Sequence, residues 1–390
     1  MPILNNLTIL VNHHKVGELL KEDSNYIFRY QNEVDKTGFV SLTMPVRARN
    51  YEHSKLPPIF EMHLPEGYLL AVIQKHLTKV IGNDDLNLLA ALAQSIRGRV
   101  QYQATNKTPK PDKTLTLDAL LNPADNLFEE LLERFALHSA ISGVQPKVLA
   151  QIQDKVTLQF EDYIVKTWGD EYPELALNEY WCMKIVQAAN IPVPEFYLSA
   201  DARLFIMKRF DITNNHYLGF EDACVLQGKG REDKYEGSYE LLAKTILSFV
   251  SPQHKIAAMK QYFKMTVLNQ ILQNGDAHLK NFGILYQDTH NIWLAPAYDI
   301  VSTTAYIKND MSALTLMGSR KWWPKKHLIK FGQQHCNLTA AQATELYQEC
   351  VNACQKIAQQ LEVELNKNPS QQQKEILQHL LAKVEGHHFS

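Results

Sequence analysis

The type of hydrophobic periodicity changes along this chain, and the change restricts the folds that the sequence can form. Apolar residues alternate at period two over residues 26–30, and residues 156–160 and 163–168 are also strand-like. From Tyr239 onward helical spacing dominates, apart from residues 283–299, which predict a hairpin of two short strands. Strands first and helices afterwards predict an α+β fold, although many α+β folds share this order.

Local signals predict the remaining elements. A polar turn at residues 12–14 predicts a hairpin of residues 7–11 and 15–19. Further strands are predicted at residues 38–44, 148–153, 196–198 and 204–208, and helices at residues 84–95, 126–135 and 174–189. The last two helices begin with capping signals, which are Thr339 with Gln342 and Ser370 with Gln373.

The length of 390 residues is enough for two or three domains. Residues 104–114 are polar and contain two prolines, so they are the best candidate for a linker, although a surface loop within one domain fits them equally well. The predicted division is a small α/β domain over residues 1–110, a strand-rich segment over residues 111–210 and a mostly helical segment over residues 211–390.

Composition excludes several classes of protein. Hydrophobic residues make up 45% of the chain, as in globular proteins, and 40 basic residues nearly balance 42 acidic ones. No overall positive field therefore exists to hold nucleic acid directly. The five cysteines are odd in number and form no C-x-x-C pair, which predicts reduced thiols. With no evident signal peptide or membrane span, we expect a cytoplasmic protein.

The most informative segment is residues 274–283, in which Asp276 and Asn281 are five residues apart. In a kinase catalytic loop, an Asp accepts the proton of the substrate hydroxyl and an Asn five positions later binds Mg²⁺. An Asx-rich turn that ends the preceding helix would explain the same residues without any catalytic role.

A second acidic residue strengthens the catalytic interpretation. Asp299 follows an apolar strand and lies 23 residues beyond Asp276, where kinases place their second metal-binding Asp. The alternative is a helix N-cap in front of Ile300.

Lys166 ends a strand-like run, Tyr163-Ile-Val-Lys166, which resembles the strand that places a Lys on the α/β-phosphates of ATP. Glu179 begins the apolar part of the next helix and is placed to pair with Lys166. A solvated strand end and ordinary helix surface are the alternatives. Upstream, residues 142–147 form a turn in the position of a phosphate loop, but a single Gly makes this signal weak.

Taken together, these segments resemble the HipA family of bacterial toxin kinases over nearly the whole chain. The matching motifs are Ser142-Gly-Val-Gln-Pro-Lys147, Asn178–Glu179, Lys208-Arg-Phe-Asp211, Asp276-x-His-x-Lys-Asn281 and Tyr298-Asp-Ile300, with Leu42-Thr-Met-Pro45 and Leu64-Pro-Glu-Gly67 in the N-terminal part.

The resemblance implies a two-lobed α+β fold like that of protein kinases, related to lipid kinases, with an added N-terminal α/β subdomain. Residues 1–110 would be this subdomain, residues 111–210 the N-lobe and residues 211–390 the C-lobe. It also implies ATP and Mg²⁺ as cofactors, an aminoacyl-tRNA synthetase as the protein substrate, and a HipB-like helix-turn-helix antitoxin as the partner that contacts DNA.

Site residues follow from the same resemblance. Asp276 would be the catalytic base or the residue that orients the acceptor. Lys166, supported by Glu179, would bind the α/β-phosphates, while Asn281 and Asp299 would hold Mg²⁺. The hinge that binds adenine would be formed by Met207, Lys208 and Phe210. Nucleotide contacts would also come from Ser142, Gly143, Gln145, Lys147 and His278, although a structural role for His278 is equally open.

The chain departs from the family pattern at its phosphate loop. The family's autophosphorylated serine corresponds to Ala140, whereas Ser142 matches a second serine found in some members. We therefore expect inhibitory autophosphorylation at Ser142, with Ser139 as a weaker candidate, because a phosphate there would repel ATP.

Several alternatives stay open. The chain could be a lipid or small-molecule kinase, or a pseudokinase that acts as co-repressor with the antitoxin. Residues 322–326 form a basic aromatic cluster that could dock a tRNA-bearing substrate or operator DNA, although packing of the tryptophans is favoured. Residues 229–234 form a charged loop that could face a protein substrate, although a solvated loop is the default prediction.

Overall fold

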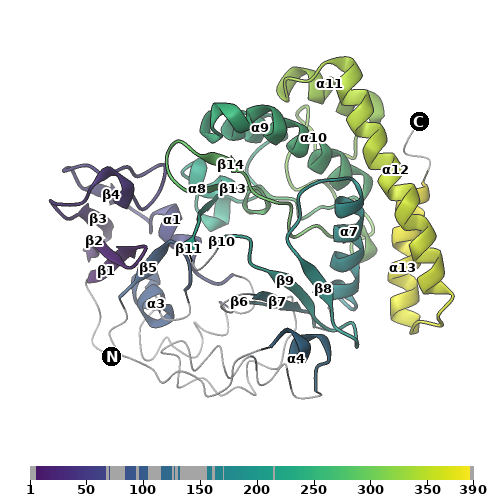
Figure 1. Ribbon diagram of the computed structural model, residues 1–390, viewed down its shortest axis with the longest axis horizontal. Helices are drawn as coiled ribbons and strands as arrows, with labels where there is room; N and C mark the ends of the chain where they lie inside the picture. The colour runs from purple at the N-terminus through teal and green to yellow at the C-terminus, as the bar shows by residue number, and fades with distance from the viewer. Residues whose placement is uncertain are drawn as a thin grey trace. The chain divides into compact units, whose positions relative to one another are not determined.

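A computed structural model describes residues 6–66, 70, 84–93, 96–103, 116–124, 127, 131, 156–159, 163–169, 171–213 and 216–386. The chain divides into two compact units (Figure 1). The first comprises residues 1–171, 199–221 and 228–231, and the second comprises residues 172–198, 222–227 and 232–390.

The first unit begins with a five-stranded antiparallel sheet in the order β4-β3-β2-β1-β5. Its strands are β1 (Asn6–Val11), β2 (His14–Glu22), β3 (Asn25–Tyr30), β4 (Tyr51–His53) and β5 (Val100–Tyr102). Asn12 and His13 both have positive φ, as a tight two-residue hairpin turn requires. The predicted hairpin and the strand over residues 26–30 are confirmed.

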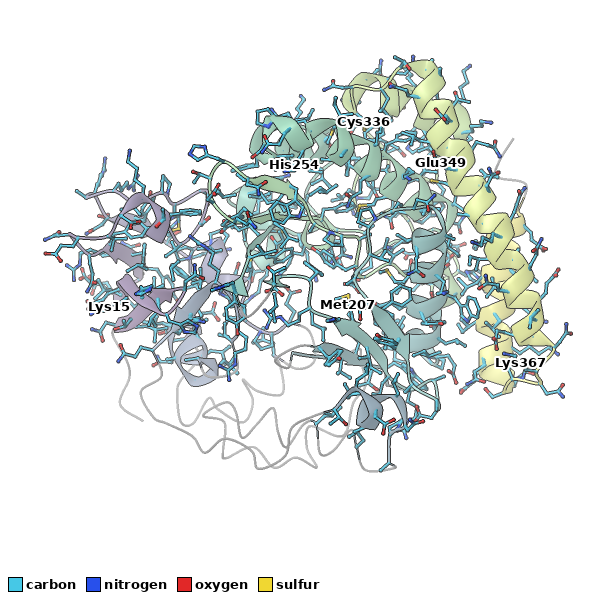
Figure 2. All side chains as sticks on the ribbon, viewed as in Figure 1. Lys15, Met207, His254, Cys336, Glu349 and Lys367 are labelled. Carbon is cyan, nitrogen blue, oxygen red and sulfur yellow. The ribbon has the colours of Figure 1, made fainter. Side chains whose placement is uncertain are left out.

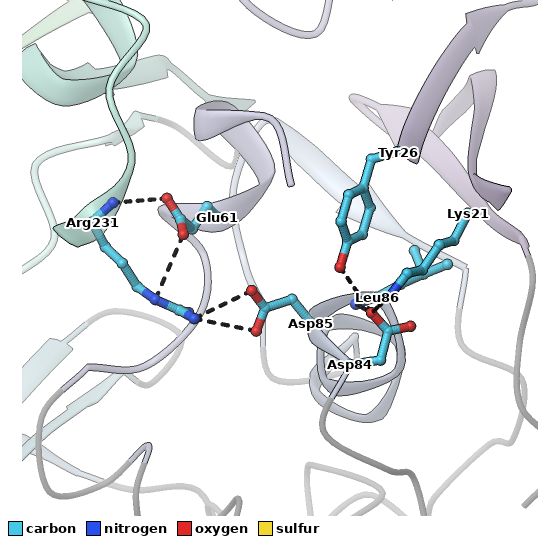
Figure 3. A network of polar contacts seen from close by, with 7 residues as sticks. All are labelled: Lys21, Tyr26, Glu61, Asp84, Asp85, Leu86 and Arg231. Atoms are coloured by element: carbon cyan, nitrogen blue, oxygen red, sulfur yellow. Dashed lines mark hydrogen bonds and ion pairs between the residues drawn. The ribbon is translucent and has the colours of Figure 1, made fainter. Parts of the chain in front are cut away.

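Two helices supply further core side chains to this unit, namely α1 (Pro58–Glu61) and α3 (Asp85–Leu92). Phe60 packs against Phe28 of the sheet, with ring centroids 5.4 Å apart. Asp84 caps α3 and accepts a hydrogen bond of 2.8 Å from the Tyr26 hydroxyl (Figure 3). The helix predicted at residues 84–95 is confirmed over its described part.

Arg231 is held by two carboxylates of the same unit (Figure 3). Its guanidinium lies 3.2 Å from Asp85 and 3.5 Å from Glu61, and its backbone N–H donates to Glu61 at 2.8 Å. The prediction of a solvated loop at residues 229–234 is therefore wrong at Arg231, because tertiary partners anchor that side chain.

The prediction of a strand at residues 38–44 is wrong. This segment contains an isolated bridge between Ser41 and Met44 and belongs to no named strand. Side chains satisfy its backbone, since the Tyr30 hydroxyl accepts from the Val40 N–H at 2.8 Å and buried Glu221 accepts from the Leu42 N–H at 2.8 Å. A neighbouring strand is thus not needed to pair these groups.

A second antiparallel arrangement in the first unit joins β6 (Val156–Gln159), β7 (Tyr163–Thr167) and β9 (Phe205–Lys208). All three strands lie where the sequence predicts them. Six further short elements are described between residues 117 and 226. They are α4 (Leu117–Leu121), β8 (Phe196–Leu198), β10 (Ile212–Thr213), β11 (His216–Tyr217), β12 (Gly219–Asp222) and α8 (Ala223–Leu226).

The second unit is mainly helical, and the prediction of mostly helical structure from Tyr239 onward is confirmed. Its longer helices are α7 (Leu175–Ala188), α9 (Tyr239–Phe249), α10 (Lys255–Ile271), α11 (Lys325–His335), α12 (Ala340–Leu365) and α13 (Gln371–Glu385). The hairpin predicted at residues 283–299 is present as β13 (Gly283–Tyr286) and β14 (Ile292–Leu294). Helices α12 and α13 pack along each other (Figure 1), and each begins with the predicted capping box.

The core of the second unit contains a chain of buried aromatic rings. Tyr262 of α10 lies 5.8 Å from Phe282 and 6.2 Å from Phe331 between ring centroids, and Phe282 lies 6.3 Å from Tyr239. Their burial fixes α9, α10 and α11 around the segment that carries Asp276 and Asn281.

The aromatic cluster at residues 322–326 packs onto the second unit. The Trp322 indole N–H donates to the carbonyl of Asp310 at 3.1 Å, and the Trp323 indole N–H donates to that of Leu316 at 2.9 Å. These bonds support packing over docking.

The five cysteines are buried and unbridged, as expected of reduced thiols. In the described parts of the chain, no helix combines the length and apolar character needed to cross a membrane. The candidate linker at residues 104–114 and the strand at residues 148–153 lie outside the described residues, as does the helix at residues 126–135 apart from Leu127 and Leu131.

Candidate functional site

Asp276 lies in a tight loop that follows α10. Gln273 has a left-handed backbone (φ 53°), and buried Asn274 binds Asn269 through both its backbone and its side chain. The Asn274 side-chain carbonyl also accepts from the Asp276 N–H at 3.1 Å. The Asx turn that sequence analysis offered as an alternative is therefore real, and it builds the loop that carries Asp276.

Gly275 allows this loop to approach the chain after Asp299. Its N–H donates to the Thr303 hydroxyl at 2.8 Å, and that hydroxyl in turn donates to the Asp310 carboxylate. A Cβ atom at Gly275 would overlap the Asp310 carboxylate and would lie 2.8 Å from the Met311 carbonyl. The position therefore requires the absence of a side chain.

Asn281 joins the two predicted metal-binding segments. It lies at the end of a short 3-10 helix (Leu279–Asn281), and its amide nitrogen donates to the carbonyl of Asp276 at 2.8 Å and contacts that of Asp299 at 3.5 Å. Because both partners are carbonyls, the nitrogen must face them, and the side-chain oxygen Oδ1 is left to ligate a cation. Asn281 is five positions beyond Asp276 and Asp299 is 23 positions beyond it. The contacts of Asn281 thus bring these three residues together.

Asp299 does not cap a helix. It has a left-handed backbone (φ 57°), and the next helical turn is a 3-10 turn (Thr303–Ala305) that begins after Ser302. The capping alternative is therefore wrong. Left-handed residues other than glycine are uncommon, and such conformations cluster at functional sites.

Asn178 fixes the segment that follows Asp299. Fully buried on α7, it accepts from the Ser302 N–H at 2.9 Å and donates to the Ser302 carbonyl at 3.0 Å. Its neighbour Glu179 is also buried. The interpretation of these two residues as ordinary helix surface is wrong, since burial of such groups requires polar partners.

Tyr235 contacts the Asp276 carboxylate directly. Its hydroxyl donates to Oδ1 at 2.6 Å, and its ring packs edge-on against buried His278 with centroids 5.1 Å apart. The His278 Nε2 atom lies 3.7 Å from the same Oδ1. Sequence reasoning assigned Tyr235 no role, because a tyrosine after a charged loop carries no signal of its distant partner.

Tyr298 and Lys280 extend the polar surroundings of these loops. The Tyr298 hydroxyl donates to the Lys280 carbonyl at 2.8 Å, and the Lys280 ammonium lies 3.9 Å from Asp222. Burial, reinforced by the negative charges of Asp222 and Asp299, raises the pKa of Tyr298 far above its ordinary value. This phenol therefore stays protonated and acts as a donor.

Lys166 lies on β7 of the first unit and is only 6% exposed, so a solvated strand end is the wrong description. Its ammonium is 5.6 Å from the ring of Phe205 on β9. On β9, Met207, which is labelled in Figure 2, is buried, and Lys208 is exposed. Phe210 packs edge-on against Phe220, with centroids 5.5 Å apart.

Some predicted contacts stay predictions. Lys166 and the hinge residues belong to the first unit, whereas Glu179, Asp276, Asn281 and Asp299 belong to the second. The phosphate-loop residues Ser139, Ala140, Ser142, Gly143, Gln145 and Lys147 lie outside the described residues.

The donor set suits a weakly held cation rather than a dedicated metal cage. Within the described ranges, no three His, Cys, Asp or Glu side chains gather as metal ligands. Mg²⁺ in phosphate chemistry is held by one or two carboxylates together with substrate phosphates. One carboxylate residue, Asp299, and one amide oxygen, Asn281 Oδ1, fit that requirement, and their segments are linked by the contact from the Asn281 amide nitrogen to the Asp299 backbone carbonyl.

Comparison with known proteins relates both parts of the chain to one family. Residues 7–103 match the model of the HipA N-terminal domain, and residues 139–358 match that of the HipA-like C-terminal domain. Two Sinorhizobium fredii proteins are similar in sequence. "Putative kinase Y4dM" is 28% identical over 295 residues, which are 68% of this chain and 67% of that protein. "Putative kinase Y4mE" is 30% identical over 302 residues, or 68% of this chain and 69% of that protein.

The fold has a counterpart among solved structures. HipA of Shewanella oneidensis, solved with HipB and operator DNA, aligns with a TM-score of 0.70 at 19% identity, covering 97% of this chain and 96% of that one. The predicted α+β, two-lobed kinase-like fold with an added N-terminal subdomain is thereby confirmed. By its domains and by its fold, the chain belongs to the HipA family.

Proposed function

We propose that the chain is an ATP-dependent Ser/Thr protein kinase that acts as the toxin of a toxin–antitoxin pair. The observation that carries this proposal is the position of Asn281, whose amide contacts the carbonyls of both Asp276 and Asp299. A kinase needs a base and two metal ligands at one phosphate, and these three residues are held together in this way.

Asp276 is proposed to accept the proton of the acceptor hydroxyl as that oxygen attacks the γ-phosphate of ATP. Its carboxylate is 39% exposed, so an acceptor can reach it, while its backbone is held by Asn274 and Asn281. Positioning and charge stabilisation provide most of the catalysis in phosphoryl transfer. A rigid loop with an accessible carboxylate meets both needs.

Lys166 is proposed to bind the α/β-phosphates and Glu179 to support it. The hinge would use the backbone of Met207 and Lys208 on adenine, with Phe210 nearby. Asn281 and Asp299 would hold Mg²⁺, which when bound neutralises charge on the transferred phosphoryl group. Ser142, Gly143, Gln145 and Lys147 would form the phosphate loop, with inhibitory autophosphorylation at Ser142.

The proposed substrate is a translation component, most directly an aminoacyl-tRNA synthetase, and the proposed location is the cytoplasm. A HipB-like antitoxin is the proposed partner, because the structurally similar S. oneidensis HipA was solved with HipB and operator DNA. Contact with DNA would then be made through the antitoxin, consistent with the net charge of −2.

A phosphotransfer assay tests the proposal. Wild type, Asp276→Asn and Asp288→Asn would each be incubated with labelled ATP, Mg²⁺ and a bacterial lysate that lacks the antitoxin. Asp288 is a suitable control because it is an exposed Asp that stabilises the β13–β14 turn, by accepting from the N–H groups of His290 and Asn291.

We expect labelling of the chain and of one lysate protein by wild type and by Asp288→Asn, and a loss of at least a hundredfold in Asp276→Asn. Labelled lipid or metabolite instead of protein would indicate a lipid or small-molecule kinase. If dephosphorylated wild type neither transfers phosphate nor binds ATP, the proposed kinase activity is refuted. The alternative of a pseudokinase that acts as co-repressor would then be supported.

A further inference from the structure

We infer that Tyr235 is the positioning residue of the Asp276 carboxylate. The Tyr235 hydroxyl donates a 2.6 Å hydrogen bond to Oδ1 of Asp276. This inference rests on the proposed function, in which Asp276 is the base, and it adds a residue to that site.

The Asp276 side chain needs an orienting partner. Its backbone is fixed, because its N–H donates to Asn274 and its carbonyl accepts from the Asn281 amide and the His278 N–H. The Asp276 side chain can still rotate about its own bonds, and this rotation changes the direction of the carboxylate. In the described part of the chain, the only side-chain hydrogen bond to this carboxylate comes from Tyr235.

Tyr235 is itself held firmly enough to orient another group. Its carbonyl accepts from the Arg320 guanidinium at 2.8 Å, and the carbonyl of Lys234 accepts from the Leu279 N–H at 3.0 Å. Two residues later, the carbonyl of Gly237 accepts from the Thr315 N–H at 3.2 Å. The tyrosine thus belongs to a segment tied both to the catalytic loop and to the chain beyond Asp310.

The ring geometry also favours a fixed residue over a movable one. The Tyr235 ring meets His278, a side chain only 7% exposed, edge-on at 5.1 Å between centroids. With Oδ1 bound to the phenol, the second carboxylate oxygen, Oδ2, is the one directed to an acceptor hydroxyl. A base oriented by a third group is the arrangement found in catalytic triads.

Because Tyr235 is 38% exposed, a competing interpretation has its side chain occupying the acceptor position and blocking it. The two interpretations predict opposite results. Loss of a positioning bond lowers kcat, since misplacement of a reacting group by about 1 Å can cost on the order of a hundredfold. Loss of a blocking group lowers KM for the protein acceptor and leaves kcat unchanged or raised.

The first test compares Tyr235→Phe with Tyr197→Phe in the full chain. Tyr197 of β8 is the matched control, because its hydroxyl also donates to a carboxylate, that of Glu195 at 3.2 Å. We expect Tyr235→Phe to lower kcat about tenfold to a hundredfold with KM for ATP unchanged. Replacing Tyr235 by 4-aminophenylalanine, which restores a donor, should recover at least part of the rate. An unchanged kcat in Tyr235→Phe, or a lower KM for the acceptor, would overturn the inference.

The second test does not depend on turnover. The 19F resonance of 3-fluorotyrosine placed at position 235 should move in Asp276→Ala and stay in place in Asp288→Ala. If the 19F chemical shift is the same in Asp276→Ala as in wild type, the contact is absent and the inference is wrong. If wild type transfers no phosphate, the proposed function fails, and the fluorine result alone then decides whether Tyr235 orients this carboxylate.

Discussion

Asn178 and Ser302, which are 124 residues apart, form a reciprocal pair of hydrogen bonds. The Ser302 N–H donates to the Asn178 side chain at 2.9 Å, and the Asn178 amide donates to the Ser302 carbonyl at 3.0 Å. One side chain on α7 therefore satisfies both backbone groups of a residue just after Asp299. The pair fixes a segment that otherwise lacks regular structure.

Replacing Asn178 by Leu should destabilise the protein. The change keeps the number and branching of side-chain heavy atoms but leaves two buried backbone groups of Ser302 unpaired, at a cost of about 2–4 kcal/mol. The free energy of unfolding in urea measures this loss. Asn352→Leu is the control, because Asn352 is exposed on α12 and its side chain accepts from the side chain of Gln348. Equal stability of the two variants would show that the Ser302 bonds contribute little.

Gly275→Ala should displace the loop that carries Asp276. The added Cβ overlaps the Asp310 carboxylate and presses on the Met311 carbonyl, so the loop must move or its bond to Thr303 must break. We expect a destabilisation of roughly 1–3 kcal/mol and a large loss of phosphotransfer. Gly318→Ala separates steric overlap from backbone strain. A Cβ atom at Gly318 would meet no atom within 4 Å, but its positive φ is unfavourable for alanine. Full activity in Gly275→Ala would contradict the proposed role of loop geometry.

Lys264 stabilises the end of α7. Its buried ammonium donates to the Ala189 carbonyl at 2.7 Å and to Glu349 of α12 at 3.0 Å. Lys264→Met keeps the aliphatic stem but removes these bonds, together with a third to the Asn190 carbonyl at 3.4 Å. It should cost about 3 kcal/mol of unfolding free energy. Lys330→Met, an exposed lysine on α11, should change stability by less than about 0.5 kcal/mol. A small effect at Lys264 would mean that water replaces the ammonium.

His379 should make stability depend on pH. It lies 3.0 Å from the Ser302 hydroxyl, and burial together with the charge of Lys383 lowers its pKa to about 4, against 6.5 ordinarily. Between these values the unfolded state binds a proton that the folded state does not, so stability falls as pH drops from about 6.5 towards 4.

His379→Gln should lessen this loss of stability at low pH, measured as the difference in urea midpoint between pH 7 and pH 5. His14→Gln, at an exposed position, should leave the difference unchanged. An identical pH dependence in wild type and His379→Gln would exclude His379 as the titrating group.

Features set by local sequence were predicted well. The capping boxes at Thr339 and Ser370 depend on residues three positions apart, and both form as expected. The placement of Asp276 and Asn281 in one loop is equally local. Such signals are readable because the interacting groups are held together by the chain itself.

Features set by distant partners were missed or misjudged. The inferred role of Tyr235 depends on its hydrogen bond to Asp276, which is 41 residues away, and no rule of sequence spacing links the two residues. Residues 38–44 look like a strand, yet Glu221 pairs with that backbone from 179 residues beyond Leu42. In both cases the deciding partner is chosen by tertiary packing.

Because of where the cysteines lie, their reactivity can report local opening of the second unit. All five buried thiols, Cys182, Cys224, Cys336, Cys350 and Cys354, belong to that unit, and the first unit has none. Burial raises the pKa of Cys354 to about 12 and also raises that of Cys350. Since the thiolate is the reactive form, alkylation requires the helices to separate. The number of alkyl groups that mass spectrometry counts on the chain therefore measures the opening of the helical unit alone, without an engineered label.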